Sequence, residues 1–358
     1  MKKSKILALL LAAVMLMGVL AACGGGGGGG EASTQPPAEE EVTTPLHFTF
    51  AHQYPASHHH NTDVIEPYIA ALTEAIPRLT IELVPGGVIS TNASVHDDIR
   101  YGTVDMAWMT HGGAPGRYPL TEILEFPNLF ASAVEATNVI EHMLATYPAF
   151  AEEFSHMKLF NIYTTEPGDI FTTKDIRVPA DVVGQRIRSP GASGERSLTA
   201  AGAVTVAMGM PDVYDSIGGV IDGLATSPSA IPTYNLWEVV DYATNGMSLY
   251  VTPFFMAFSN RAWAELTPRE QEIALSIQIE GMAFNIHSAY MYDDLGEKAI
   301  DRMREYGMTV NDLTEAEQAE WLAAMTPVID EYLDNLAERN LPGRDFYEKV
   351  IAYRDSLR

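Results

Sequence analysis

The chain has 358 residues, a formal net charge of −25 at pH 7 and a single cysteine. So acidic a chain repels nucleic acid and anionic lipid headgroups, which argues against a direct role on DNA or as a polybasic membrane binder. One cysteine cannot form a disulfide within the chain. The length is sufficient for two lobes of ordinary size after an N-terminal leader.

The N-terminus predicts export. Residues 1–5 are lysine-rich, and residues 6–20 form an apolar core too short for a comfortable membrane span, so residues 1–22 read as a signal peptide. The run Leu-Ala-Ala-Cys at 20–23 resembles a bacterial lipobox, which implies that Cys23 is lipidated. The alternative is an ordinary signal peptide followed by an incidental cysteine.

The segment after the signal predicts a tether. Residues 23–45 are rich in Gly, Pro and Glu, a composition that cannot bury a core. Removal of residues 1–22 takes away three lysines and no acid, so the formal charge of −25 becomes −28. A chain of that charge would be held at a membrane by its lipid rather than by electrostatic attraction.

The folded part begins near Leu46 and alternates between strand and helix patterns. Its first part predicts strands at 46–52, 80–84, 104–109 and 157–163 and helices at 63–76, 92–101 and 133–146. After a crossing near 166–171, the second part predicts strands at 185–189, 203–207 and 247–259 and helices at 194–201 and 212–217. This alternation is typical of sheets covered by helices.

Two capping boxes predict the last helices. Thr267, Pro268 and Glu270 open a run without proline that continues to Tyr306, which predicts one helix of about 60 Å that bridges both lobes. Thr314 and Glu317 form a second box, which predicts a helix that continues to about residue 339.

An arginine at the end of a short strand is the strongest functional signal. Residues 185–189 alternate as a strand, and Pro190 and Gly191 end it beside Arg188. A guanidinium there can bind a carboxylate through two parallel hydrogen bonds. Arg186 lies two residues earlier on the same strand face and is the second candidate. The alternative role of Arg188 is a surface ion pair, for example with Asp181.

A series of motifs carries a family resemblance. The chain reads FAHQYP at 50–55, PGGVI at 85–89, GTVDMA at 102–107, GRYPLTEILEFP at 116–127 and WAELTPREQ at 263–271. In their order and spacing these motifs resemble the solute-receptor subunits of tripartite ATP-independent periplasmic (TRAP) transporters, over Phe48 to Met308. The resemblance implies a receptor, without catalysis or cofactor, that delivers a small organic acid to integral membrane subunits.

The resemblance also implies an architecture. It predicts an α/β periplasmic-binding-protein-like fold with a ligand cleft between two lobes and a long helix that spans both. The first lobe would comprise residues 46–167 and about 251–292, and the second would comprise 168–250 and about 293–358. A monomer or a dimer is compatible with the sequence.

The resemblance assigns the ligand contacts residue by residue. The carboxylate arginine falls on Arg188, and the first-lobe contacts and the apolar wall of the second lobe fall on Gln53, Tyr54, Trp108, Thr110, His111, Met208, Met210 and Tyr214. For Trp108 and the methionines, core packing is the alternative.

Two departures from the family pattern bear on the ligand. Sialic-acid-binding members carry a further arginine at a position that falls near Gly168 here, and an asparagine where this chain has Thr226 or Ser227. The ligand is therefore not expected to be a sialic acid. Apolar and aromatic residues around the arginine predict an acid with an apolar or aromatic body; they are Tyr54, Trp108, Phe171, Met208, Met210, Trp237 and Phe254.

The sequence also contains features of other classes of function. His52, His58, His59, His60 and Asp63 form a histidine cluster that is compatible with a zinc receptor, with a helix cap, or with a ligand contact through His58. An enzyme is disfavoured because residues 191–194 lack the order of a nucleophile elbow and no acid/base pair of carboxylates stands out. A binding protein that senses its solute would share the same fold.

Overall fold

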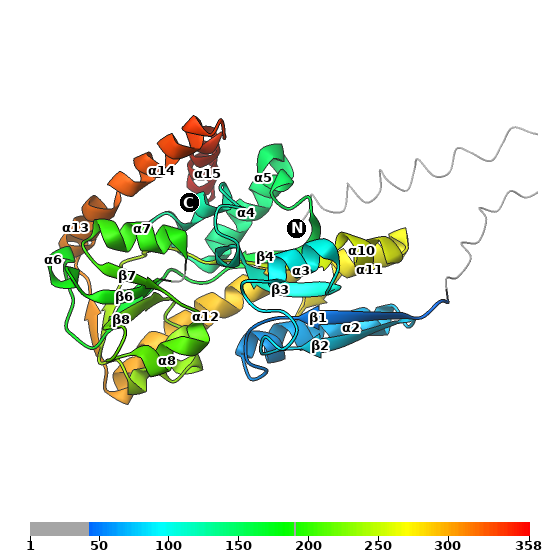
Figure 1. The fold of residues 1–358 in the computed structure, drawn as a ribbon, viewed down its shortest axis with the longest axis horizontal. Coiled ribbons are helices and arrows are strands. Elements are labelled where there is room, and N and C mark those ends of the chain that lie inside the picture. The colour runs from blue at the N-terminus through cyan, green and yellow to red at the C-terminus, as the bar shows by residue number, and fades with distance from the viewer. Residues whose placement is uncertain (1–42, 190) are drawn as a thin grey trace, which may run out of the picture. The chain divides into compact units, whose positions relative to one another are not determined.

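The computed structural model describes residues 43–189 and 191–358, which include one compact unit from Thr43 to Arg358. The predicted signal peptide, Cys23 and nearly all of the predicted tether lie outside the described residues. Two β-sheets with helices packed on them build the unit, and each sheet forms the centre of one lobe (Figure 1).

The first lobe is built on a five-stranded sheet with the order β2-β1-β3-β10-β4. Its strands are β1 (Leu46–Ala51), β2 (Leu79–Val84), β3 (Met106–Thr110), β4 (Met157–Thr164) and β10 (Pro253–Ser259). β1 is parallel to β2 and β3, whereas β10 is antiparallel to β3 and β4. Every residue of β10 is buried, which explains its continuous apolar sequence.

The second lobe is built on a six-stranded sheet with the order β13-β9-β5-β8-β6-β7. Its strands are β5 (Asp169–Thr172), β6 (Arg186–Ser189), β7 (Val204–Ala207), β8 (Gly223–Thr226), β9 (Tyr242–Asn245) and β13 (Thr309–Asp312). β6 lies between β7 and β8 and is parallel to both. Ligands of such sheets bind beyond the carboxyl ends of the strands, and Arg188 lies near that end of β6.

Short and medium helices cover the sheets. The first lobe carries η1 (Asn61–Ile65), α2 (Glu66–Ala75), α3 (Val95–Tyr101), η2 (His111–Gly113), η3 (Thr121–Glu125), α4 (Ala133–Thr146), α5 (Pro148–Glu152), α10 (Asn260–Glu265) and α11 (Pro268–Ser276). The second carries α6 (Pro179–Val182), α7 (Ala192–Ala200), η4 (Met210–Asp212), α8 (Val213–Ser216), α9 (Ala230–Thr233), η5 (Leu236–Glu238) and α13 (Glu315–Met325). None of the helices in the described ranges is both long and apolar enough to cross a membrane.

The prediction of one long helix from Pro268 to Tyr306 is wrong. The capping box at Thr267 forms, with a bond of 3.3 Å from the Glu270 backbone N–H to Thr267 Oγ1, but α11 ends at Ser276. A small hairpin of β11 (Gln278–Ile279) and β12 (Met282–Ala283) follows. Its turn holds Glu280 and Gly281 at φ 52° and 78°, a left-handed backbone that a continuing helix cannot adopt.

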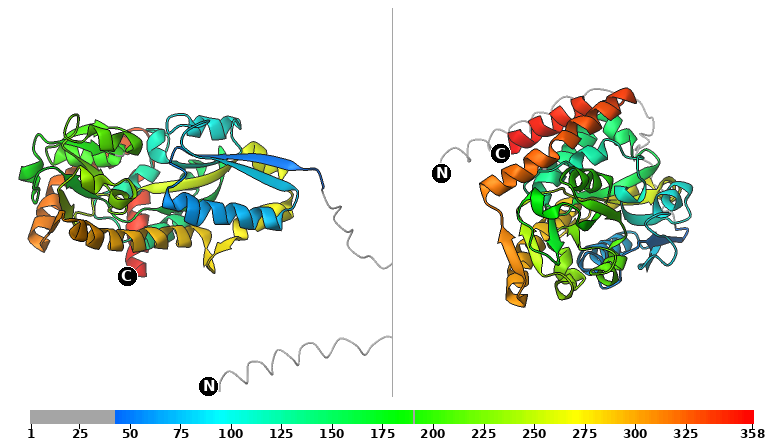
Figure 2. Two further views of the ribbon diagram at one scale, coloured as in Figure 1. Left: turned by 90° about the horizontal axis from the view of Figure 1, so that it is seen from below. Right: turned by 60° about the vertical axis from the view of Figure 1, so that its left-hand side comes forward.

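A shorter helix still links the lobes. α12 (Phe284–Tyr306) is about 35 Å long by its residue count and packs against α4 and β4 of the first lobe and α9 and β13 of the second. Figure 2 shows it running along one side of the unit, beneath both sheets. It therefore fulfils the predicted bridging role over part of the predicted length.

The C-terminal helices correct the predicted lobe boundaries. The helix predicted from Thr314 is divided at Pro327 into α13 and α14 (Pro327–Glu338), and α15 (Gly343–Leu357) follows. Core residues Leu333 and Leu336 of α14 and Phe346 of α15 belong to the same apolar cluster as α4 and β10. α15 packs on α4 of the first lobe, and α14 contacts both α15 and α7 of the second lobe, whereas the sequence placed all of 293–358 in the second. Figure 2 shows the two helices at the C-terminal end of the chain. An amphipathic pattern does not specify the surface that covers it.

Two connecting segments cross between the sheets side by side. The first joins β4 to β5 and the second joins β9 to β10. The carboxylate of Asp169 accepts hydrogen bonds from the backbone N–H groups of Gly246 (3.2 Å) and Met247 (2.8 Å), and Thr165 Oγ1 accepts from the Thr252 N–H at 3.1 Å. These bonds tie the two crossings to each other between the lobes.

Candidate ligand-binding cleft

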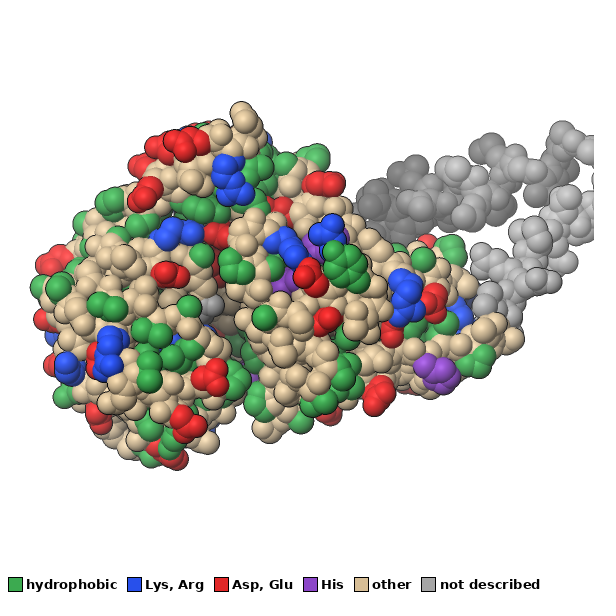
Figure 3. All heavy atoms as spheres, in the orientation of Figure 1, with side chains coloured by type: hydrophobic (Ala, Val, Ile, Leu, Met, Phe, Trp, Pro, Cys, Tyr) green, Lys and Arg blue, Asp and Glu red, His purple; other side chains and the backbone are tan. Residues whose placement is uncertain are grey.

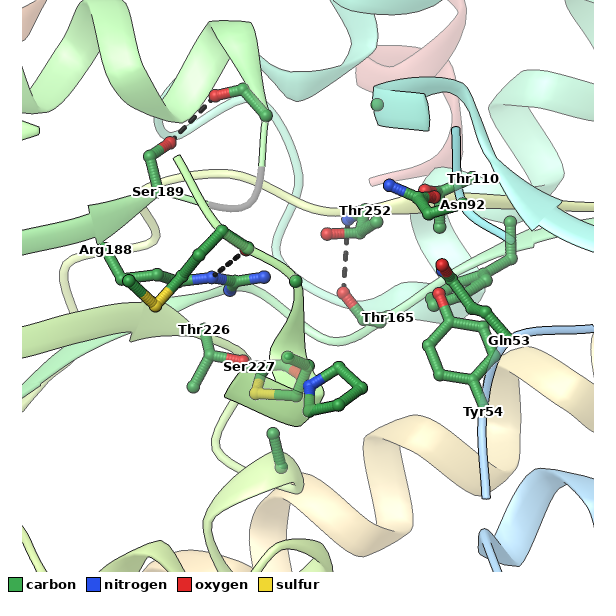
Figure 4. A pocket seen from close by; sticks show the side chains of 18 of the residues that line it. Gln53, Tyr54, Asn92, Thr110, Thr165, Arg188, Ser189, Thr226, Ser227 and Thr252 are labelled. Carbon is green, nitrogen blue, oxygen red and sulfur yellow. Dashed lines mark hydrogen bonds between the residues drawn. The ribbon is translucent and has the colours of Figure 1, made fainter. Parts of the chain in front are cut away.

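A cavity of about 460 Å³ lies between the two sheets. It opens at the hollow between the lobes in Figure 3 and is shown from close by in Figure 4. Both lobes contribute to its walls, and the predicted site residues that line it are Gln53, Tyr54, His58, Thr110, Arg188, Met208, Met210, Thr226 and Ser227. Its volume suits a small organic molecule.

Arg188 reaches into this cavity from the end of β6 (Figure 4). It is only 5% exposed, and its guanidinium donates to two carbonyls, from Nε to Met208 O at 3.1 Å and from Nη1 to Ala225 O at 3.2 Å. No carboxylate of the described residues lies within ion-pair distance of it. Burial lowers the pKa of Arg188, yet an arginine side chain stays charged. A buried cation with only carbonyl partners favours an anionic ligand.

Arg186 is occupied elsewhere. Its guanidinium donates to both carboxylate oxygens of Asp222, at 3.1 and 2.8 Å, and to Gly219 O at 2.7 Å. Asp181, the alternative partner of Arg188, instead accepts hydrogen bonds from backbone N–H groups at the start of α6. The geometry therefore presents Arg188, and not Arg186, to the cavity.

The first lobe forms the wall opposite Arg188. Figure 4 shows Gln53 and Tyr54 across the cavity from the guanidinium. The Tyr54 ring packs on Trp108 and Phe254, with centroid distances of 4.3 and 5.9 Å. Burial raises the pKa of Tyr54 to about 12, so its hydroxyl is protonated and can donate a hydrogen bond. Trp108 itself is 1% exposed and lies behind Tyr54, so it supports the wall without lining it.

His111 and Tyr214 do not line the cavity. His111 is buried with its Nε2 atom 3.2 Å from Glu125 Oε2. Burial alone would lower the pKa of His111, but the nearby carboxylates, Glu125 foremost, outweigh it and raise that pKa. Tyr214 is 37% exposed and donates to Glu238 at 2.6 Å. In the described structure, these two residues form local structural contacts outside the cavity.

Two aromatic residues of the expected apolar wall are likewise elsewhere. Phe171 is completely buried in the core of the second lobe, because residues of a central strand with helices on both faces are covered from both sides. Trp237 stacks on Tyr306 at 4.9 Å. Phe254 does line the cavity, as expected, and Tyr234 and Tyr292, which the sequence analysis did not identify, add aromatic surface.

Gly168 acts through a neighbour. A Cβ atom at this position would lie 3.0 Å from Cζ of Tyr250, so glycine makes room for that ring. Tyr250 lines the cavity near Arg188, and its buried hydroxyl has no hydrogen-bond partner among the described residues. Gly168 itself does not line the cavity. Sequence reasoning missed Tyr250 because a lone tyrosine in a connecting segment carries no pattern.

Asn92 is a second residue that sequence reasoning missed. It lines the cavity on the first-lobe side, near Thr110 (Figure 4). A Cβ atom at Gly113 would lie 2.3 Å from the Asn92 carbonyl oxygen and 2.8 Å from its Oδ1 atom, so this approach requires glycine. The glycine pair after Thr110 was the only available signal, and it does not identify its partner.

The histidine cluster is an aromatic and hydrogen-bonded wall. His52 Nε2 lies 2.9 Å from Asn61 Oδ1, and His60 Nε2 lies 2.8 Å from the Tyr163 hydroxyl. Burial lowers the pKa of His52, His58, His59 and His60, so all four rings are neutral at neutral pH. Across residues 43–189 and 191–358, no three His, Cys, Asp or Glu side chains are arranged to hold a metal ion.

Comparison with known proteins gives a periplasmic binding protein as a relative. The chain is 27% identical over 170 residues to the C4-dicarboxylate-binding periplasmic protein DctP of Rhodobacter capsulatus, an alignment that covers 46% of this chain and 50% of that protein. The chain thus matches about half the length of this relative.

Solved structures give the fold. A TRAP solute-binding protein from a marine metagenome, specific for aromatic acids and solved with metahydroxyphenylacetate, has a TM-score of 0.80 at 22% identity and covers 87% of this chain and 99% of its own. A TRAP solute-binding protein from Rhodoferax ferrireducens, solved with copurified benzoate, has a TM-score of 0.78 at 20% identity, with coverage of 87% and 99%.

The profile of one family matches the chain over residues 50–335, which includes every residue that lines the cavity and both sheets except the first four residues of β1. That family is described as bacterial extracellular solute-binding protein, family 7 (DctP). The chain belongs to this family and is therefore an extracellular solute receptor rather than an enzyme, as its sequence indicated.

Proposed function

We propose that this receptor captures a small organic acid with an apolar or aromatic body and delivers it to the membrane subunits of a TRAP transporter. The observation that carries the proposal is Arg188, a buried cation that faces the cavity without a carboxylate partner among the described residues. A ligand carboxylate would supply the missing negative charge through the free side of the guanidinium.

The residues that line the cavity support a ligand with an apolar or aromatic body. Tyr54, Tyr234, Phe254 and Tyr292 provide ring surface, and Met208 and Met210 add flexible apolar contacts. A polyhydroxylated acid would have to exchange many hydrogen bonds to water for contacts with these walls. The structural neighbours that hold metahydroxyphenylacetate and benzoate are consistent with an aromatic ligand.

The remaining predictions belong to this proposal. Contacts from both lobes surround the cavity, so a ligand held by Arg188 and by the Tyr54 wall would favour the closed arrangement. Export with lipidation of Cys23 would keep the receptor at the membrane that holds its transporter. Work as a monomer or as a dimer fits the proposal equally.

The test combines identification of the ligand with substitution of Arg188. Mass spectrometry on the purified protein is expected to find a copurified organic acid, and calorimetry is expected to show tighter binding of benzoate than of glucuronate. Arg188→Ala is expected to weaken benzoate binding by about 2 to 5 kcal/mol, the range for removal of one partner from a buried charged pair.

Arg186→Ala is the matched control, because this arginine lies on the same strand and is occupied by Asp222. It is expected to leave the affinity for benzoate unchanged. Wild-type affinity in the Arg188→Ala protein would contradict the proposed anchor. Preference for glucuronate would contradict the proposed body of the ligand.

A further inference from the structure

The hydrogen positions of His58 follow from its neighbours. The backbone N–H of His60 lies 3.2 Å from His58 Nδ1, and because a backbone N–H can only donate, Nδ1 must be the acceptor. The neutral ring therefore carries its hydrogen on Nε2. His58 lines the cavity, and its Nε2 has no partner among the described residues and is not fully covered by protein atoms. His58 thus presents an N–H donor to the ligand space.

The ring is held in this orientation from several sides. Its centroid lies 4.3 Å from His59, 5.4 Å from Trp108 and 5.5 Å from Tyr54. The ring centroid of Tyr234, in the second lobe, lies 6.0 Å from that of His58. Packing of this kind restricts rotation of the imidazole, and burial lowers its pKa well below the usual value, so the donor is fixed and uncharged.

A hydrogen bond between the two lobes lies next to the His58 donor. Thr233 Oγ1 donates to Ser229 O at 2.7 Å, so at its 3.3 Å contact with His59 Nδ1 it accepts the hydrogen of the ring. His59 belongs to the first lobe and Thr233 to the second. A ligand that fills the cavity displaces water from this N–H group, so a ligand without an acceptor there would leave the donor without a partner.

We propose, on the basis of the proposed function, that the ligand carries a neutral acceptor oxygen on its body, as a hydroxyl or oxo group, and that His58 selects for it. The carboxylate binds Arg188, and the second oxygen accepts the Nε2–H bond of His58. The receptor thereby distinguishes a hydroxylated or oxo acid from the parent acid of the same shape.

A second carboxylate is a poorer match for this position. Among the described residues that line the cavity, Arg188 is the only arginine or lysine, and Glu195 adds a negative charge. A carboxylate beside His58 would lose its hydration and would contact an uncharged imidazole ring instead of a cation. The receptor is therefore expected to prefer monocarboxylates to dicarboxylates such as succinate.

The test pairs ligands that differ in one oxygen with proteins that differ in one donor. Calorimetry would compare benzoate, its three monohydroxylated isomers and succinate in the wild-type, His58→Leu and His58→Gln proteins. At least one hydroxybenzoate is expected to bind the wild type about 3- to 10-fold more tightly than benzoate does, as expected for one hydrogen bond. His58→Leu is expected to remove that advantage, so that this variant binds the hydroxybenzoate and benzoate with affinities within about twofold of each other. His58→Gln, which keeps an N–H donor, is expected to restore part of it.

Three outcomes would overturn the inference: no hydroxyl advantage in the wild type, an advantage that survives His58→Leu in a protein with wild-type circular dichroism, or tighter binding of succinate than of benzoate. The first two leave the proposed function intact if Arg188→Ala still weakens the binding of the acids, whereas tighter binding of succinate would also contradict the proposed body of the ligand. Benzoate affinity that is unaffected by Arg188→Ala would instead reject the proposed function itself.

Discussion

Arg188 shows how far a single residue can be interpreted from sequence. The stop at Pro190 and Gly191 placed it at the end of a strand, and the structure presents it to the cavity. Its rival Arg186 could not be dismissed from sequence, because its partner Asp222 lies 36 positions along the chain. Tyr250 left no signal, and the glycine pair that accompanies Asn92 does not identify it, since the two positions depend on close approaches to Gly168 and Gly113.

The geometry around Arg188 predicts that lysine cannot replace it. Two of its donors are engaged by Met208 O and Ala225 O, and the rest of the planar group faces the cavity. An ammonium group on a shorter, non-planar head cannot make both carbonyl contacts and a two-pronged carboxylate contact. We expect Arg188→Lys to weaken binding of benzoate at least tenfold, about 1.4 kcal/mol, in calorimetry. Equal affinity would show that charge alone is sufficient.

Among the helices and strands, sequence patterns predicted the elements whose ends are set by neighbouring residues. The helix at 133–146 was predicted with its observed bounds, and its cap forms, with the Glu135 backbone N–H donating to Ser132 Oγ at 3.0 Å. The hairpin after α11 was missed because a run without proline does not by itself specify a continuous helix. The Glu280-Gly281 pair was a turn signal that could have revealed it.

The segment that begins at His58 predicts a dependence of stability on pH. Burial lowers the pKa of His59 to about 4 in the folded protein, whereas the unfolded chain takes up this proton near 6.5. Because the unfolded state binds more protons below 6.5, the stability is present above that pH and is lost as the pH falls toward 4. Between pH 7 and pH 5, the wild type is expected to lose up to about 2 kcal/mol more than His59→Gln.

Urea unfolding at the two pH values measures this difference. His47→Gln is the matched control, because His47 lies exposed on β1, away from the segment that begins at His58. It is expected to follow the wild type. If His59→Gln loses as much stability as the wild type over this range, the ring is not kept neutral by burial.

On the scale of the whole molecule, contacts between the lobes flank the cavity. Arg196 of α7 forms an ion pair of 2.9 Å with Glu122 of η3, and its guanidinium lies 4.2 Å from the centroid of the Tyr332 ring. Ser193 donates to Glu125 O at 3.2 Å nearby. Sequence alone predicted two lobes but none of these contacts, since each joins residues that are far apart in the chain.

Loss of the Arg196 pair is expected to favour the open arrangement of the lobes. The ion pair is partly exposed, so Arg196→Ala is expected to reduce benzoate affinity by at most about 1 kcal/mol, or about fivefold, and to increase the radius of gyration in small-angle scattering. Arg344→Ala, which breaks ion pairs only between α14 and α15, serves as control. An affinity loss that is equal in both variants would argue against a role in closure.

The course of the chain has a consequence for engineering. The backbone leaves the first sheet after β4, returns through β10, leaves again along α12, and comes back a last time to pack α15 on α4 of the first lobe. A chimera that takes residues 169–245 from another receptor would receive most of the second lobe, including the position of Arg188. The first-lobe residues Gln53, Tyr54 and His58 would remain those of this protein. Residues from separate segments of the chain thus determine ligand preference, so exchange of a single segment cannot transfer it.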